Sequence, residues 1–92
     1  MRKIRWSKQF TKDHRRESRG TYRAALDALL REVVALLLSD TKLPDRLRDH
    51  ALNGKWETYR DCHLRPNLVL IYRKTDDELL FARLGSHSEL GL

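Results

Sequence analysis

The most regular pattern in the chain is an amphipathic helix in its first half. Apolar side chains recur at the spacings of three, four and seven residues that line one face of a helix. They are Tyr22, Leu26, Leu29, Leu30, Val33, Val34 and Leu37. Thr21 is the expected N-cap, because its hydroxyl can accept a first-turn N–H. The helix is expected to end near Ser39 and Asp40, since Pro44 cannot occupy a helix interior.

A short strand and a shorter helix are predicted upstream of it. Residues 4–6 have the sequence Ile-Arg-Trp and are expected to form a strand. Ser7 can cap a helix over about residues 8–18, and Gly20 offers a C-cap.

The second half of the chain predicts three consecutive strands. They are expected over residues 56–64, 68–72 and 79–84, with turns at 65–67 and 75–77. The continuous apolar run of the middle segment is typical of a central strand. Residues 44–54 are expected to be irregular, with a short helical turn after Pro44 and a turn at Asn53-Gly54. A polar tail is expected after Gly85.

This order, βααβββ, predicts an α+β fold in which two N-terminal helices pack on one face of an antiparallel sheet. The length of 92 residues favours a single domain over residues 1–92 with one core. Such a domain has room for one open site, which is expected on the uncovered face of the sheet.

The charge is concentrated at the N-terminus. The chain has 19 Lys and Arg against 13 Asp and Glu, a net charge of +6, and the excess of cations lies within residues 1–23. Arginine predominates over lysine, which favours bidentate binding of phosphate or carboxylate groups. A polyanion or an acidic protein is therefore the expected partner, and a small neutral metabolite is not.

Cys62 is the only cysteine, so neither an intrachain disulfide nor a cysteine-based zinc site is expected. A packed core thiol and a reducing cytoplasmic location are expected instead. The longest apolar run, residues 33–38, falls far short of the ~20 residues of a membrane span. The N-terminus shows no apolar export segment.

Three histidines are the candidate catalytic groups. His50, His63 and His87 fall in loops or at strand ends, and Arg60, Arg65, Arg73 and Arg83 accompany them. Imidazoles can donate and accept protons near neutral pH, and guanidinium groups stabilise extra negative charge. Metal-free RNA cleavage by attack of a ribose 2′-OH on its own phosphate needs these groups. Spacing alone favours solvated surface histidines, which are the more usual case in loops and polar tails.

No metal or other cofactor is expected. The histidines are 13 and 24 residues apart, which matches neither a helical nor a strand ligand pair, and no carboxylate stands beside them in a ligand-like repeat. Cys62 adjoins His63, but neighbouring strand residues face opposite sides. Trp56 and Tyr59 could stack on a nucleobase, although packing against the sheet is the stronger expectation.

The same segments resemble the RelE/ParE toxin superfamily and, within it, the YafQ-type ribosome-dependent mRNA endonucleases. The resemblance is carried by residues 49–56 (DHALNGKW), 59–63 (YRDCH), 70–72 (LIY) and 83–90 (RLGSHSEL), and the first half matches only in outline. It implies a RelE-like microbial RNase fold and a type II toxin that cleaves mRNA in the ribosomal A site. It further implies that His87 is the chief general acid, that His50 and His63 assist, and that Arg83 neutralises phosphate charge.

The resemblance also implies two partners. One is an acidic antitoxin that folds on binding, and the other is the A site of the 30S ribosomal subunit with its mRNA. The side chains expected to bind substrate are Lys8, Arg15, Arg60, Arg65, Asn67 and Arg73.

The chain departs from the family pattern after Pro66, where Asn67-Leu68 replaces Asp-Trp, and at the C-terminus, where Gly91-Leu92 replaces an aromatic residue. Asn67 keeps a hydrogen-bonding side chain without a carboxylate charge. Two alternatives therefore stay open: a non-nucleolytic ParE-like toxin that acts on DNA gyrase, and an RNA-binding or antitoxin-binding module with weakened catalysis.

Overall fold

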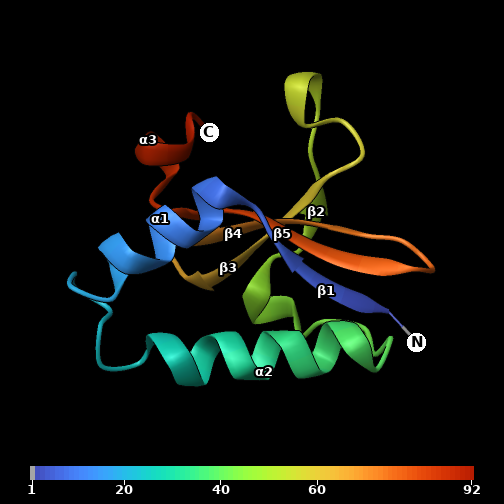
Figure 1. Ribbon diagram of the computed structural model, residues 1–92, viewed down its shortest axis with the longest axis horizontal. Helices are drawn as coiled ribbons and strands as arrows, with labels where there is room; N and C mark the ends of the chain where they lie inside the picture. The colour runs from blue at the N-terminus through green and yellow to red at the C-terminus, as the bar shows by residue number, and fades with distance from the viewer. Residues whose placement is uncertain (1) are drawn as a thin grey trace.

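The computed structural model describes residues 2–92 and contains one five-stranded sheet with the order β1-β5-β4-β3-β2 (Figure 1). The strands are β1 (Lys3–Trp6), β2 (His50–Ala51), β3 (Arg60–Arg65), β4 (Leu68–Lys74) and β5 (Glu78–Gly85). The helices are α1 (Lys8–Glu17), α2 (Leu26–Leu38) and α3 (His87–Leu90), with 3-10 turns η1 (Asp45–Leu47) and η2 (Gly54–Trp56). The predicted α+β class is confirmed.

The sheet is mixed. Strands β3, β4 and β5 form the expected antiparallel meander. Strand β1 instead pairs parallel with β5, with Lys3 opposite Glu78 and Trp6 opposite Phe81. The expectation of a wholly antiparallel sheet was wrong for this strand, because two helices separate β1 from the rest of the sheet and no hairpin reverses its direction.

Helix α1 continues along the edge of β5 where β1 stops. Ser7 begins the helix, and its hydroxyl accepts the N–H of Phe10 at 2.9 Å. The same hydroxyl donates to the carbonyl of Ala82 at 2.6 Å, and the N–H of Ser7 donates to the carbonyl of Phe81 at 3.0 Å. Ser7, at the junction of strand and helix, therefore provides hydrogen-bond donors to the carbonyl groups of Phe81 and Ala82 at the edge of β5.

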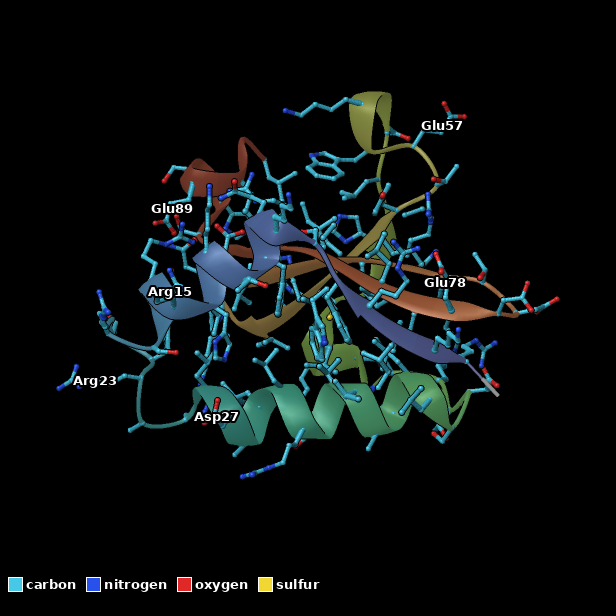
Figure 2. All side chains as sticks on the ribbon, in the orientation of Figure 1. Arg15, Arg23, Asp27, Glu57, Glu78 and Glu89 are labelled. Atoms are coloured by element: carbon cyan, nitrogen blue, oxygen red, sulfur yellow. The ribbon has the colours of Figure 1, made fainter. Side chains whose placement is uncertain are left out.

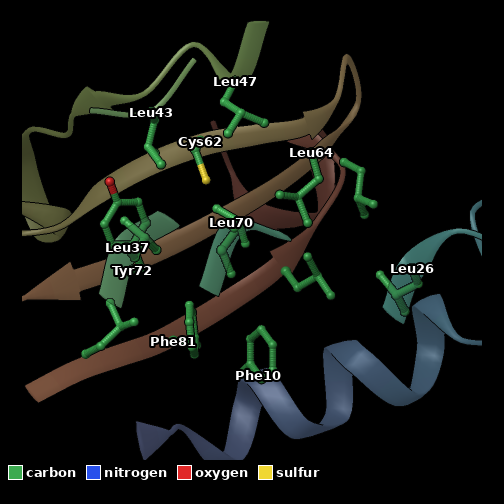
Figure 3. Packing of buried hydrophobic residues seen from close by; sticks show 14 residues of the cluster. Phe10, Leu26, Leu37, Leu43, Leu47, Cys62, Leu64, Leu70, Tyr72 and Phe81 are labelled. Atoms are coloured by element: carbon green, nitrogen blue, oxygen red, sulfur yellow. The ribbon is translucent and has the colours of Figure 1, made fainter. Parts of the chain in front are cut away.

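The main core lies between the sheet and α2, and α1 closes it at one end (Figures 1 and 3). Its buried members are Phe10, Leu26, Val33, Leu37, Leu43, Leu47, Cys62, Leu64, Leu68, Leu70, Tyr72, Leu79, Phe81 and Leu84. Cys62 is a buried core thiol as predicted, and burial raises its pKa. Because strand residues alternate between faces, the intervening residues of β3, β4 and β5 are left for the opposite face.

The opposite face carries a second, smaller cluster, so it is not simply open as was expected. Val69, Ile71, Ala82 and Leu90 are buried there, and Leu52, Trp56 and Tyr59 pack against them. The rings of Trp56 and Tyr59 meet edge to face with centroids 5.2 Å apart. The expected packing of these aromatic side chains is confirmed, and the cluster leaves only part of this face accessible.

The helix boundaries differ from the prediction at two points. Helix α2 begins at Leu26 and not after Thr21, because residues 21–25 form turns and the N-cap Ala25 has no side chain to accept a hydrogen bond. Helix α1 ends with Ser18 as its C-cap, two residues before Gly20. Within residues 2–92, no helix is long and apolar enough to cross a bilayer.

The strand boundaries differ in the second half. β3 begins at Arg60, because residues 54–56 form η2 and Thr58 takes a left-handed conformation with φ of 78°. The polar tail contains helix α3. The helix begins at a reciprocal capping box between Ser86 and Glu89, and it ends at Gly91, which takes a left-handed conformation. The expected turn at residues 75–77 is present between β4 and β5.

Truncating a core side chain should lower the free energy of unfolding more than truncating a surface side chain. Leu70→Ala removes a fully buried side chain and is expected to lower the free energy of unfolding by about 2–5 kcal/mol. Leu38→Ala, at a position that is 39% exposed, should cost less than about 1 kcal/mol. Urea unfolding measures both values, and similar costs for the two variants would contradict the described core.

Candidate active site

Three histidines from distant parts of the chain meet on the second face of the sheet. His50 lies on β2, His63 on β3, and His87 is the first residue of α3. The ring centroids of His50 and His63 are 6.3 Å apart, and those of His63 and His87 are 5.1 Å apart. The structure thus brings together the three histidines that the sequence singled out, and we call them the histidine cluster.

The register of the strands places the first of these side chains. His50 is paired with Asp61 across β2 and β3, Asp61 with Ile71, and Ile71 with Arg83. Directly paired residues project from the same face of a sheet. His50, Asp61 and Arg83 therefore lie in one row that crosses four strands.

The next row along the strands supplies the other two histidines. His63 follows Asp61 by two residues and so projects from the same face. It is paired with Val69, which is itself paired with Gly85 at the end of β5. Two residues later the chain reaches His87, so the end of β5 delivers α3 to His63.

Asp61 is a buried carboxylate inside the histidine cluster, and no role was predicted for it from the sequence. Its side chain is 4% exposed, and its Oδ1 lies 3.0 Å from Nδ1 of His50 and 3.9 Å from Nε2 of His63. Burial raises the pKa of Asp61, and the positive charges of the neighbouring histidines oppose this effect. The expectation that no carboxylate stands beside the histidines was wrong, and the spacing of two residues between Asp61 and His63 on a strand was the available signal.

His63 is the most enclosed histidine of the cluster, with a side chain that is 11% exposed. Burial lowers its pKa, and the Asp61 carboxylate offsets this only in part. Repulsion from His87 and His50 lowers the pKa further. A histidine in this environment is neutral at physiological pH and can accept a proton.

Asn67 orients His87. The side-chain oxygen of Asn67 lies 2.8 Å from Nδ1 of His87 and also accepts the backbone N–H of His87 at 3.1 Å. An amide oxygen can only accept, so it assigns the Nδ1 proton to His87 and leaves Nε2 for other partners. Asn67 therefore retains a contact to the histidine despite its departure from the family pattern.

Arg83 is held by a buried carboxylate on α1. Nε of Arg83 donates to Asp13 at 2.8 Å, and the N–H of Leu84 donates to the same carboxylate at 3.0 Å. Arg16 donates to Asp13 at 3.0 Å and to the carbonyl of Leu84 at 2.7 Å, and it pairs with Glu89 of α3 at 3.1 Å. These contacts connect α1 through β5 to the helix that carries His87 (Figure 2, Glu89).

Gly85 leaves room for two side chains where these elements meet. A Cβ at this position would lie 2.7 Å from Nη2 of Arg16 and 3.0 Å from Oε1 of Glu89. Any larger residue would displace the Arg16 guanidinium from its place between β5 and α3.

The other predicted substrate-binding residues are distributed over several surfaces. Arg60 makes a two-pronged ion pair with Asp49, at 2.8 Å and 3.1 Å, on the core side of β3, so the structure does not bring it to the histidines. Arg73 lies over the ring of Tyr59 at 5.1 Å. Arg65 lies on the β3–β4 hairpin beside His63, and Lys8 and Arg15 are exposed on α1 (Figure 2, Arg15).

His50, Asp61 and His63 also form a set that could hold a metal ion. One potential ligand atom from each lies within 4.8 Å of the others. Two imidazoles and a carboxylate suit zinc or copper. Oδ1 of Asp61 and Nδ1 of His63 are buried without a hydrogen-bond partner among residues 2–92, so the donor set fits such an ion. This set could not be predicted from the spacing of the histidines, because its members come together only through the pairing of β2 with β3.

Comparison with known proteins assigns this chain and its fold to the toxins of bacterial type II toxin-antitoxin systems. The family model described as a bacterial toxin of such a system, YafQ, matches residues 2–91. The mRNA interferase toxin YafQ of Escherichia coli BL21-DE3 is 38% identical, over 97% of this chain and 95% of the relative. The chain belongs to the YafQ family, which confirms the resemblance seen in the sequence.

Structures of related toxins share the whole fold. The toxin in a DinJ-YafQ complex of E. coli superposes with a TM-score of 0.81 at 34% identity, over 98% of both chains. A copper-bound mutant toxin from Helicobacter pylori superposes with a TM-score of 0.84 at 40% identity, over 98% of this chain and 99% of that chain.

The contacts of Asp13 are expected to make the free energy of unfolding depend on pH. Burial alone would raise the pKa of Asp13, but hydrogen bonds from Arg83, the Leu84 N–H and Gln9 outweigh it and leave the pKa below its ordinary value. A carboxyl group whose pKa is lower in the folded state stabilises the fold above its unfolded pKa and loses that effect as the pH falls. Asp13→Asn should therefore cost about 1.5–3 kcal/mol at pH 7.

The stability difference between the wild type and D13N should shrink as the pH falls below about 4. The carboxyl group is then protonated first in the unfolded state and, at lower pH, in the folded state as well. Urea unfolding at pH 7 and at pH 3 measures the difference. An equal or larger difference at pH 3 would show that the charge of Asp13 is not what the network uses.

Proposed function

We propose that the protein is an endoribonuclease that cleaves mRNA in the A site of the ribosome by attack of a 2′-OH on the adjacent phosphate. The observation that carries the proposal is the histidine cluster, in which His63, with a side chain only 11% exposed and a lowered pKa, lies 5.1 Å from His87, centroid to centroid. A pair of imidazoles with different environments can act as base and acid in one reaction. The name of the E. coli relative, an mRNA interferase, supports the same class of substrate.

In the proposed reaction His63 accepts the proton of the ribose 2′-OH while the 2′ oxygen forms a bond to phosphorus. The bond between phosphorus and the 5′ oxygen breaks, and His87 donates a proton from Nε2 to this leaving oxygen. The products are a 2′,3′-cyclic phosphate and a 5′-hydroxyl end. His50 and Arg83 are proposed to position the phosphate and to offset the charge that builds up on it.

Asp61 is proposed to act through the histidines and not on the RNA. Its carboxylate is buried beneath His50 and His63, within 3.0 Å and 3.9 Å of their nitrogen atoms. A negative charge in that place favours imidazolium once His63 has taken a proton. It is therefore a positioning and electrostatic residue in this scheme.

The partners follow from charge and from the family. The exposed cations of α1, among them Lys8 and Arg15, suit contact with ribosomal RNA. An acidic antitoxin that folds on binding is proposed as the protein partner, in keeping with the DinJ-YafQ complex of E. coli. Action on the ribosome places the toxin in the cytoplasm.

Family membership favours the nuclease over the two alternatives. A toxin that acts on gyrase would need no histidine cluster, and the retained contact between Asn67 and His87 argues against a decayed active site. Gyrase–DNA adducts without RNA cleavage would support the first alternative, and tight RNA binding without cleavage would support the second.

The cleavage assay compares two variants, each of which replaces one histidine with alanine. His87→Ala is expected to reduce cleavage of ribosome-bound mRNA by about 10²–10⁴-fold, because the leaving oxygen loses its proton donor. His14→Ala removes a histidine on α1 that pairs with Asp27 at 3.5 Å, and it should leave the rate unchanged. Undiminished cleavage by H87A would refute the assignment of the acid.

A second proposal for the same site is that it takes a copper or zinc ion on His50, Asp61 and His63, which the copper-bound toxin of H. pylori also suggests. An ion there would occupy a nitrogen atom of His63, the proposed base, and one of His50. Added Cu²⁺ is therefore expected to bind with one-to-one stoichiometry and to inhibit cleavage. Asp61→Ala should weaken binding in calorimetry and His14→Ala should not. Equal binding by both variants would place the ion elsewhere.

A further inference from the structure

An arginine-lined hollow opens beside the histidine cluster, and no role in the scheme above accounts for it. It has a volume of about 500 Å³ and is lined by Arg46, Arg48, His63, Leu64, Arg65 and Pro66. His63 is the residue shared by the hollow and the cluster. The two sites therefore adjoin each other at this side chain.

The charge of the hollow is only partly neutralised. Arg46 pairs with Glu32 of α2. Within residues 2–92 no carboxylate forms an ion pair with Arg48 or Arg65, and the one hydrogen bond of the Arg65 guanidinium goes to the carbonyl of Leu64 at 3.3 Å. Two guanidinium groups are thus available to an anion at one wall of the active site.

The backbone at Arg48 is specialised. This residue is not glycine, yet it takes a left-handed conformation with φ of 48° and ψ of 42° at the end of η1. Its carbonyl accepts Nδ1–H of His50 at 3.0 Å. One residue therefore orients a histidine of the cluster with its main chain and contributes its side chain to the neighbouring hollow.

We propose that this hollow binds the phosphodiester of the nucleotide next to the cleavage point, with Arg48 and Arg65 as its ligands. The proposal rests on the proposed function, because His63 then faces the scissile phosphate on one side and the hollow on the other. In this arrangement the two arginines would bind the next phosphate of the same strand. Held at two successive phosphates, the RNA strand is fixed on both sides of the bond that breaks.

The test measures binding of short RNA analogues to the purified toxin. The probe is a dinucleoside monophosphate with a 2′-O-methyl group at the cleavage point, used without a terminal phosphate, with a 5′-phosphate and with a 3′-phosphate. One of the two terminal phosphates is expected to tighten binding to the wild type by about tenfold. The double variant Arg48→Gln, Arg65→Gln should lose that gain and bind all three probes alike.

Salt dependence and a matched control make the test specific. For the phosphorylated probe, the slope of log K against log salt should fall by about 0.7 in the double variant, the value for one phosphate contact of a single strand. The control is Arg19→Gln, Arg23→Gln, which removes the same charge from the turn between α1 and α2 (Figure 2, Arg23). It should keep the gain from the terminal phosphate.

Three results would overturn the proposal. They are a gain that persists in the Arg48, Arg65 variant, the absence of any gain in the wild type, and loss of the gain in the control. A triglutamate peptide is tested in parallel, and arginine-dependent binding of the peptide alone would make the hollow an acidic-peptide site. Cleavage of ribosome-bound mRNA by the wild type is scored separately, so failure of the hollow and failure of the nuclease are distinguishable.

Discussion

The structure depends on one buried carboxylate. Asp13 of α1 has no exposed surface, and it accepts hydrogen bonds from the main chain of β5 at Leu84 and from the side chains of Arg83 and Arg16. A buried carboxylate is tolerated only with such a full set of donors. Because Arg16 reaches on to Glu89, the same set fixes α3 and hence His87. A contact on the far side of β5 from the histidines therefore governs the geometry of the proposed acid.

Local patterns in the sequence carry much of this architecture. Short stretches of residues predict the apolar face of α2, the Ser7 cap and the three strands of the meander. Each of these is present close to its predicted place. The parallel pairing of β1 with β5 is not local, since it joins residues 3–6 to residues 78–81. The capping box that begins α3 was readable at Ser86 and Glu89, but a four-residue helix has too little periodicity to stand out in a polar tail.

The candidate site divides in the same way. The three histidines could be named because imidazoles are rare and chemically distinctive, and the family resemblance supported them. Asp61 could not be ranked above other acidic residues until the register with His50 showed that it is buried between two imidazoles. Arg60 was expected at the substrate and proved to be held by Asp49, because strand alternation turns it toward the core. The positions of Asp61 and Arg60 depend on strand pairing and burial, which cannot be predicted from one short stretch of sequence.

Both edge strands of the sheet are short. β1 has four residues before Ser7 and α1 take its place along β5, and β2 on the other side has only two residues. Exposed, regular margins recruit further strands and lead to aggregation, so a sheet without them can stay dispersed at high concentration. The shortness of β2, on which His50 is exposed, therefore limits the pairing of a further strand at this edge.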